Sequence, residues 1–279
     1  MDRKQEHAFA EFVAESGAAQ PAGPAAHGTT VHLTAAQKTL FGLSHAAAKT
    51  ARPSGRYVVM SEQSASVDSS GSETGPKTSV IDTVTGGGVE YQDITVKGEQ
   101  GTPIPPARLT AAKGSSPTVA QLDAMPADPT ALRANLLATA RQQLEQAEKI
   151  SEQQLAKTGK PYPKAKLPQS TDDDLVFEAA TDLLWEPHLS PQLRSALYKV
   201  LANTPGVVVN ANATDSSGHP AVEISRPDTA GGTNVETFED PSTGATLESA
   251  WNYGHGEYSE DLYESIEYTD TIPADPYKN

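Results

Sequence analysis

The amino-acid sequence predicts an α+β fold in which helices pack on one face of a curved antiparallel β-sheet. Strand-like runs rich in β-branched and aromatic residues occupy residues 56–96 and 207–271, whereas the clearest helical patterns lie between them. Short turns rich in Gly, Pro and Asp join successive strands, and strands joined in this way run antiparallel. Separate runs of strands and helices are typical of α+β proteins.

Composition divides the chain into a tail and one folded domain. The 279 residues are 37% hydrophobic and include 21 glycines and 21 prolines, so we expect ordered structure interleaved with long loops. We assign residues 1–30 to a flexible N-terminal tail because residues 17–30 have the composition of a linker. Residues 1–16 also fit a short amphipathic helix that docks on the domain. Residues 31–279 form the single α+β domain.

Charge and cysteine content exclude several classes of partner and site. The net charge of −15 disfavours binding to nucleic acids and to anionic membrane surfaces, because both would repel the protein. The absence of cysteine excludes disulfides, thiolate metal sites, a cysteine nucleophile and a lipid anchor on cysteine.

We expect no transmembrane segment in this chain. The first residues, MDRKQEHAFAEFVAESG, lack the apolar run of a signal peptide, and no stretch reaches 18 apolar residues. From these residues alone we expect either a cytoplasmic protein or an exported one whose signal lies outside this sequence.

The N-terminal part of the domain predicts one helix and a group of strands. Thr34 suits the N-cap of a helix over residues 33–51, in which Leu40, Leu43 and Ala47 fall on one face. The expected strands are 56–67, 79–84 and 89–96. Three glycines between the last two strands favour a tight hairpin turn, because glycine tolerates a positive φ. A phosphate-binding loop would need a lysine and a helix start after these glycines, and neither follows.

A long helix follows an irregular, proline-rich connection at residues 98–118. Asp128 is a suitable N-cap, and Pro129 fits the first helical position, where no backbone donor is needed. Apolar residues recur at helical spacing until about residue 155, so we expect an amphipathic helix that lies on the core. The predicted buried stripe is Leu132, Leu136, Ala140, Leu144 and Ala147.

Residues 175–213 predict a helix, a turn, a second helix, a turn and a strand. Pro187 ends the first helix, Ser190 and Pro191 begin the second, and a Thr-Pro-Gly sequence ends it. The two apolar stripes are Val176, Ala179, Ala180, Leu183 and Leu184, then Leu193, Leu197, Val200 and Leu201. Because the connection is short, we expect a helical hairpin that packs on the sheet.

The rest of the chain predicts strands joined by turns at residues 215–218 and 240–244. Apolar and polar residues alternate over residues 245–253, which predicts one dry and one wet face. The dry face is Ala245, Leu247, Trp251 and Tyr253, and the wet face is Thr246, Glu248 and Asn252. In the last strand, at residues 262–271, we expect Leu262, Ile266 and Tyr268 to share a face.

No pattern in the sequence points to catalysis or to metal binding. The five histidines outside the tail are isolated, no pair has metal-ligand spacing, and the GxSxG motif of many hydrolases is absent. We therefore expect no catalytic residue, no metal site and no cofactor. One acidic cluster fits a solvated strand edge, with a calcium site or a general acid–base pair as the alternative. Its members are Glu257, Glu260, Asp261, Glu264 and Glu267.

Four stretches of the sequence carry a resemblance to a known family. Residues 122–136, 176–209, 214–226 and 239–251 resemble a family of uncharacterised actinobacterial proteins with an extracytoplasmic domain, often encoded beside extracytoplasmic-function sigma factors. More distantly, the order of elements is similar to LolA- and RseB-like domains, in which helices plug the concave side of an antiparallel half-barrel. The resemblance implies a half-barrel fold, an extracytoplasmic or membrane-tethered location, and an apolar cavity that holds a lipid moiety or senses the state of the envelope. Family members have a membrane span ahead of this domain, and this sequence shows none.

These observations predict a non-enzymatic extracytoplasmic domain for binding or sensing, which holds a lipid-like or peptide ligand between the sheet and the helices. Two alternatives remain open. The first is an acidic structural or regulatory partner of a cell-envelope protein. The second is a carboxylate-based envelope hydrolase, which needs two carboxylates about 5–10 Å apart across a cleft. The candidate ligand-lining residues are Tyr57, Val59, Leu183, Leu197, Leu247 and Trp251, each of which also fits a filled core.

Overall fold

The computed structural model describes residues 33–55, 57–67, 78–86, 89–97, 107–109, 117, 119–158, 171–227, 234–254 and 257–270. The helices in this part of the chain are α2 (Ala35–Lys49), α3 (Val119–Asp123), α4 (Pro129–Thr158), α5 (Asp172–Leu184) and α6 (Pro191–Ala202). The strands are β1 (Tyr57–Val67), β2 (Thr78–Gly86), β3 (Val89–Lys97), β4 (Ala107–Leu109), β5 (Val208–Thr214), β6 (Pro220–Ser225), β7 (Asn234–Glu239), β8 (Thr246–Gly254) and β9 (Glu257–Thr269). The tail predicted for residues 1–30 lies outside the described residues.

The strands of the described part form one open antiparallel sheet in the order β4-β3-β2-β1-β9-β8-β7-β6-β5. Strands β1 and β9 pair from Tyr57 with Thr269 to Val67 with Tyr258. This pairing joins the N-terminal strands β1–β4 to the C-terminal strands β5–β9. The predicted α+β class and antiparallel sheet are therefore confirmed.

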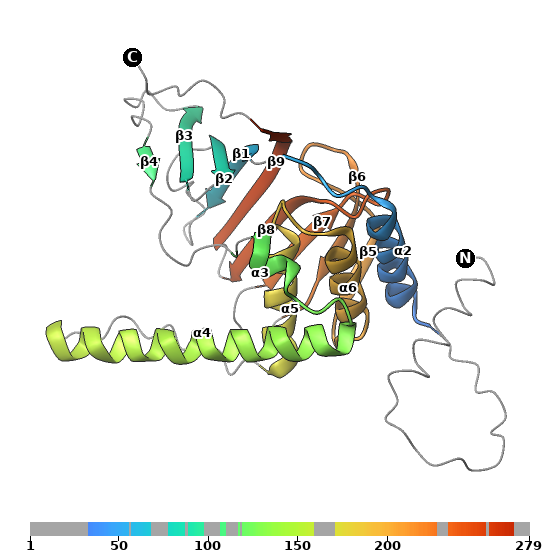
Figure 1. Cartoon of the computed structure of the whole chain (residues 1–279), viewed down its shortest axis with the longest axis horizontal. Helices are drawn as coiled ribbons and strands as arrows, with labels where there is room; N and C mark the ends of the chain where they lie inside the picture. Colours follow the sequence, from blue (N-terminus) through green and yellow to red (C-terminus); the bar gives the residue numbers. More distant parts are fainter. Residues whose placement is uncertain are drawn as a thin grey trace, which may run out of the picture.

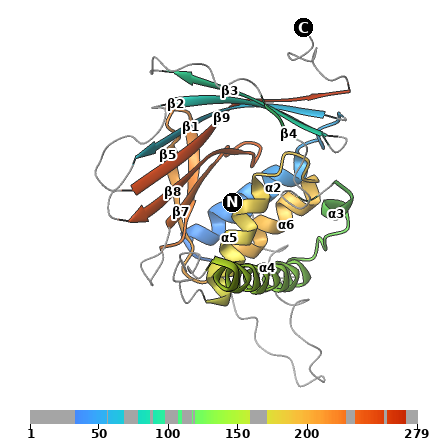
Figure 2. The same ribbon diagram turned by 90° about the vertical axis from the view of Figure 1, so that its left-hand side faces the viewer.

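Helices α2, α5 and α6 lie against one side of the sheet, and the sheet bends around them (Figure 1, Figure 2). Helix α6 packs most extensively on α2, and α4 crosses both α5 and α6. The hydrophobic core lies between these helices and strands β6 and β7. Complete burial of a leucine or valine side chain contributes about 1.5–3 kcal/mol to stability, so this junction holds the helices on the sheet. Among the described residues, no helix is long and apolar enough to span a bilayer.

Helix starts follow the local signals in the sequence. The hydroxyl oxygen of Thr34 accepts a hydrogen bond from the Gln37 backbone N–H (3.1 Å), and the Gln37 side chain accepts one from the Thr34 N–H (3.0 Å). Asp128 caps α4 by accepting from the Ala131 N–H at 2.8 Å, and Ser190 caps α6. These contacts satisfy N–H groups that have no partner within the helix. All three predicted N-caps are confirmed.

Only the first half of α4 lies on the core. Leu132, Leu136 and Ala140 are buried, whereas Leu144 is half-buried and Ala147 is exposed. Figure 1 shows the second half of this helix extending beyond the rest of the helical layer. The prediction that the apolar stripe remains on the core as far as Ala147 is therefore wrong beyond Ala140.

Strand β8 contains a β-bulge that reverses the predicted faces. Glu239 pairs with Thr246 and Phe238 pairs with Glu248, so Leu247 has no opposite residue in β7. An extra residue of this kind changes which side chains face each side of the sheet. Thr246 and Glu248, both predicted to be wet, are 5% and 2% exposed, whereas Leu247 is half-buried. The predicted strict alternation in this strand is therefore wrong.

A similar irregularity occurs in β9. Ser61 pairs with Ser265 and Glu62 pairs with Tyr263, so Glu264 has no opposite residue in β1. Leu262 therefore faces the opposite side of the sheet from Ile266, and the prediction of one shared face is wrong. Strand β4 lies inside the connection predicted to be irregular, and the short helix α3 was not predicted.

Candidate functional site

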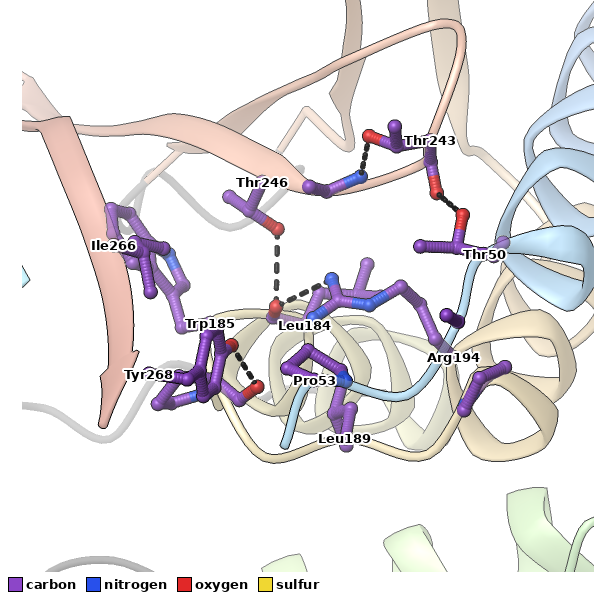
Figure 3. A pocket seen from close by; sticks show the side chains of 15 residues that line it. Thr50, Pro53, Leu184, Trp185, Leu189, Arg194, Thr243, Thr246, Ile266 and Tyr268 are labelled. Carbon is purple, nitrogen blue, oxygen red and sulfur yellow. Dashed lines mark hydrogen bonds between the residues drawn. The ribbon is translucent and has the colours of Figure 1, made fainter. Parts of the chain in front are cut away.

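A pocket of about 240 Å³ lies where the end of α2, the connection between α5 and α6, and strands β8 and β9 meet (Figure 3). Its lining is mainly Ala, Pro, Leu, Ile and aromatic side chains. Arg194 is the one charged side chain among the described lining residues. The lining comprises Ala47, Thr50, Ala51, Pro53, Leu184, Trp185, Pro187, Leu189, Pro191, Arg194, Thr243, Ala245, Thr246, Ile266 and Tyr268.

The connection between α5 and α6 is fastened to the sheet beside this pocket. The Tyr268 hydroxyl of β9 donates a hydrogen bond to the Pro187 carbonyl at 2.5 Å. The Trp185 indole N–H donates to the Ser249 hydroxyl of β8. The Trp185 ring also stacks on Trp251, with ring centroids 6.4 Å apart and an interplanar angle of 16°. One wall of the pocket is therefore held in place by two strands.

Arg194, in the first turn of α6, donates to three backbone carbonyls of the described residues. Its Nη1 lies 3.0 Å from Leu184 O and 3.3 Å from Gly244 O, and its Nη2 lies 3.4 Å from Glu186 O. Leu184 is the last residue of α5 and Glu186 follows it closely, and the helix dipole favours a cation at this end of a helix. Arg194 thus links the end of α5 to the turn between β7 and β8, next to the pocket.

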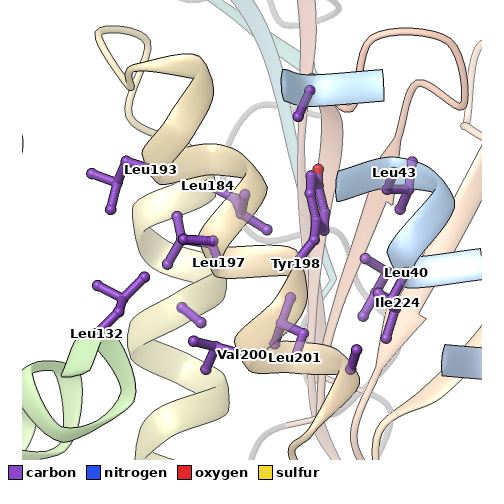
Figure 4. Close-up of a cluster of buried hydrophobic side chains, with 14 of the residues drawn as sticks. Leu40, Leu43, Leu132, Leu184, Leu193, Leu197, Tyr198, Val200, Leu201 and Ile224 are labelled. Carbon is purple, nitrogen blue, oxygen red and sulfur yellow. The ribbon is translucent and has the colours of Figure 1, made fainter. Parts of the chain in front are cut away.

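A buried carboxyl group lies directly behind the pocket wall. Glu239 is completely buried, and its Oε2 lies 2.9 Å from both the Tyr198 hydroxyl and the Thr246 hydroxyl. Thr246 itself lines the pocket. Figure 4 shows Tyr198 of α6 close to Leu43 of α2, within the core. Burial raises the pKa of Glu239, and the Arg194 charge and the neighbouring hydroxyls oppose that rise only in part.

The number of protons in this cluster favours a neutral Glu239. The Tyr198 hydroxyl also lies 2.7 Å from Gly244 O, and the Thr246 hydroxyl lies 3.2 Å from Leu184 O. The two hydroxyl protons must serve four oxygen–oxygen contacts, and the two carbonyls can only accept. A protonated Glu239 supplies a third proton. Its Oε1 has no hydrogen-bond partner among the described residues, which a neutral carboxyl tolerates better than a carboxylate.

The residues predicted to line a ligand cavity lie at different places in the fold. Leu197 is completely buried in the core, and Leu183 of α5 packs on the core from its edge. Val59 of β1 and Leu247 at the bulge are half-buried. Trp251 stands next to the pocket through its stacking on Trp185. The side chain of Tyr57 lies outside the described residues. None of the five described side chains lines this pocket, whose lining is drawn from helix ends, connections and other residues of strands β8 and β9.

The isolated acids and histidines do not converge. In the described ranges, no three His, Asp or Glu side chains are arranged to hold a metal ion. His188 lies edge-on to Tyr268, with ring centroids 6.0 Å apart, and burial and then the Arg52 charge lower the pKa of His188. His219 contacts Asp215 through its Nδ1 at 2.9 Å, within a turn.

Comparison with known proteins adds no relative to this picture. No model of a protein family matches the chain, and a search of curated proteins gives no match.

Proposed function

We propose that the protein is a non-catalytic binding or sensing domain that holds a small apolar ligand in the pocket between the sheet and the helices. The observation that supports this proposal is the mainly apolar lining, drawn from both layers of the fold. Pockets for drug-sized ligands usually measure about 300–1,000 Å³. A volume of about 240 Å³ suits part of a lipid chain or a single apolar side chain of a peptide.

We further propose that the fold is a half-barrel similar to LolA- and RseB-like domains. An open antiparallel sheet that bends around helices is consistent with a half-barrel of that type. The same resemblance supports an extracytoplasmic or membrane-tethered location for this domain. Protease treatment of intact cells, compared with lysed cells, tests the location, and protection of the domain in intact cells of a single-membrane species would contradict it.

Binding of a neutral apolar dye tests the pocket. We expect N-phenyl-1-naphthylamine to gain fluorescence with the folded protein. Ala51 lines the pocket and is exposed, so Ala51→Trp should fill the space and weaken dye binding by about tenfold or more, which corresponds to about 1.4 kcal/mol. Ala138→Trp, on the exposed face of α4, is the matched control and should bind as the wild type does. No dye signal, or equal binding by both variants, would contradict the proposal.

An acidic partner protein is the second candidate, supported by the net charge of −15. Attraction between exposed charges weakens as salt rises, whereas apolar binding does not. Capture of a basic envelope protein that is lost at high salt, with no dye binding, would favour this candidate. The carboxylate-based hydrolase gains no support here, because no Asp or Glu is among the described lining residues.

A further inference from the structure

We propose that this pocket selects a small amphiphile with a carboxylate group, which pairs with Arg194 while the apolar part contacts Trp185, Ile266 and Tyr268. The inference rests on the proposed binding function and names its ligand class: a free medium-chain carboxylic acid in its ionised form.

Within the described part of the chain, Arg194 forms no ion pair with a carboxylate. Four other arginines of the described chain each form an ion pair with an aspartate. These pairs are Arg52–Asp123, Arg133–Asp173, Arg141–Asp172 and Arg226–Asp174. No such pair within 4.0 Å involves Arg194 in the same part of the chain. Across the protein, 36 acidic residues outnumber 21 basic ones. The described residues that line the pocket nevertheless include no Asp or Glu.

Arg194 also retains N–H donors that the three backbone carbonyls do not use. A guanidinium group has five N–H donors, and the three carbonyl contacts described above use three of them. The side chain is half-buried in an apolar wall, where attraction to an anion is less screened than at the surface. Figure 3 shows its guanidinium group beside Leu184, among the side chains that line the pocket. A ligand carboxylate can therefore meet an uncompensated charge and unused donors.

Glu239, the buried acid behind the pocket wall, does not neutralise Arg194. An ionised Glu239 would compete with a ligand carboxylate for this cation. The hydrogen-bond count for Tyr198 and Thr246 favours a protonated Glu239, as does complete burial. A neutral Glu239 leaves the positive charge of Arg194 available on the pocket side.

The pocket volume guides the choice of chain length for a test ligand. At roughly 30 Å³ for a water-sized unit, 240 Å³ accommodates about eight such units, and a methylene group is of similar size. An acid of about eight carbons therefore fills the space, and its chain meets the apolar wall.

Three probes of equal chain length test the inference on the wild-type protein: octanoate, octan-1-ol and octylamine. Tryptophan fluorescence reports binding, because one of the two tryptophans, Trp185, lines the pocket. A charge-assisted hydrogen bond is stronger than a neutral one by enough to change affinity about tenfold. We therefore expect octanoate to bind about tenfold more tightly than octanol, and octylamine to bind most weakly.

Two variants locate the selectivity. Arg194→Met should remove the preference for octanoate over octanol, whereas Arg141→Met, which deletes an exposed arginine of α4, should keep it. Circular dichroism checks that Arg194→Met folds, because Arg194 also holds backbone carbonyls. If it does not fold, the three probes on the wild type still decide the question.

Each outcome has a distinct meaning. Equal binding of octanoate and octanol overturns the carboxylate inference and leaves the apolar pocket standing. Failure of all three probes, with no dye binding, overturns the proposed function as well. An unchanged preference for octanoate in folded Arg194→Met overturns the role of Arg194.

Discussion

Glu239 is an acid placed where water does not reach, with hydroxyl groups around one oxygen and no hydrogen-bond partner on the other among the described residues. Its burial raises its pKa above the ordinary value of 4.5. The folded protein therefore keeps this proton at pH values where the unfolded chain has lost it. The contribution of Glu239 to stability consequently falls as pH rises above about 4.5, until the pH passes the raised pKa of this group in the folded state.

We predict that Glu239→Gln flattens this part of the pH dependence. The glutamine amide is neutral at every pH and donates hydrogen bonds, as the protonated carboxyl does. At pH 4.5 the variant should lie within about 1 kcal/mol of the wild type, and it should gain relative stability as pH rises towards 8. Urea unfolding at several pH values measures the difference.

The control is Glu145→Gln, on the exposed face of α4, whose stability should follow the wild type across the same range. If Glu239→Gln also runs parallel to the wild type, then Glu239 releases its proton at the same pH in the folded and unfolded states.

The roles of some individual residues cannot be predicted from the sequence around them. Glu239 and Tyr198 lie 41 positions apart, and each is unremarkable in its own segment: a polar strand residue and a tyrosine beside an apolar stripe. Their roles arise from tertiary contact, which periodicity does not encode. Leu197 was correctly placed on a buried stripe. Arg194 carried no local signal, because its importance comes from the lack of an ion-paired carboxylate among the described residues around it.

At the scale of elements, helix starts could be predicted and sheet irregularities could not. A cap is local: Thr34, Asp128 and Ser190 each contact a backbone N–H three residues ahead. A β-bulge depends on the register of a partner strand, so the residues around Leu247 and Glu264 do not predict the bulges there. The far half of α4 is a similar case, since its apolar spacing continues after the surface that it could cover has ended.

The turn between β7 and β8 provides a matched pair of glycine substitutions. Gly244 has φ +65°, and an added Cβ would lie 3.1 Å from Tyr198 Cε2 and 3.2 Å from Leu43 O. Gly218, in the turn between β5 and β6, has φ +85° with no atom within 4 Å of an added Cβ. Both positions disfavour alanine through backbone conformation, but only the first also crowds the core.

We therefore predict that Gly218→Ala costs about 1–2 kcal/mol and that Gly244→Ala costs at least about 1 kcal/mol more. Urea unfolding of the two variants in one buffer gives the comparison. Equal losses would show that Tyr198 and α2 move aside without cost, which would contradict a tightly packed cluster behind the pocket.

At the scale of the whole molecule, the pairing of β1 with β9 decides the architecture. Hairpins between neighbours in the sequence could be predicted from their turns. The pairing of Val58 with Tyr268 joins positions about 210 residues apart, and no local signal selects that partner. Contacts of this range slow folding, because the entropy cost of closing a long loop must be met before the contact can stabilise the chain.

The same pairing predicts that the sheet and the pocket unfold together. Val58 is completely buried and pairs with β2 on one side and β9 on the other, while β9 supplies Ile266 and Tyr268 to the pocket. Val58→Ala should cost about 2 kcal/mol through the lost methyl groups and the cavity left behind. The midpoint measured by far-UV circular dichroism should fall together with that measured by tryptophan fluorescence.

Val208→Ala, at a side chain that is 51% exposed on β5, is the control and should change stability by less than about 0.5 kcal/mol. If Val58→Ala lowers the dichroism midpoint but not the fluorescence midpoint, the N-terminal strands melt as a separate unit. The pocket wall on β9 would then keep its position without β1. Coincident midpoints instead mean that occupation of the pocket stabilises strands far from it, because a ligand that binds only the folded state stabilises every element that unfolds with the site.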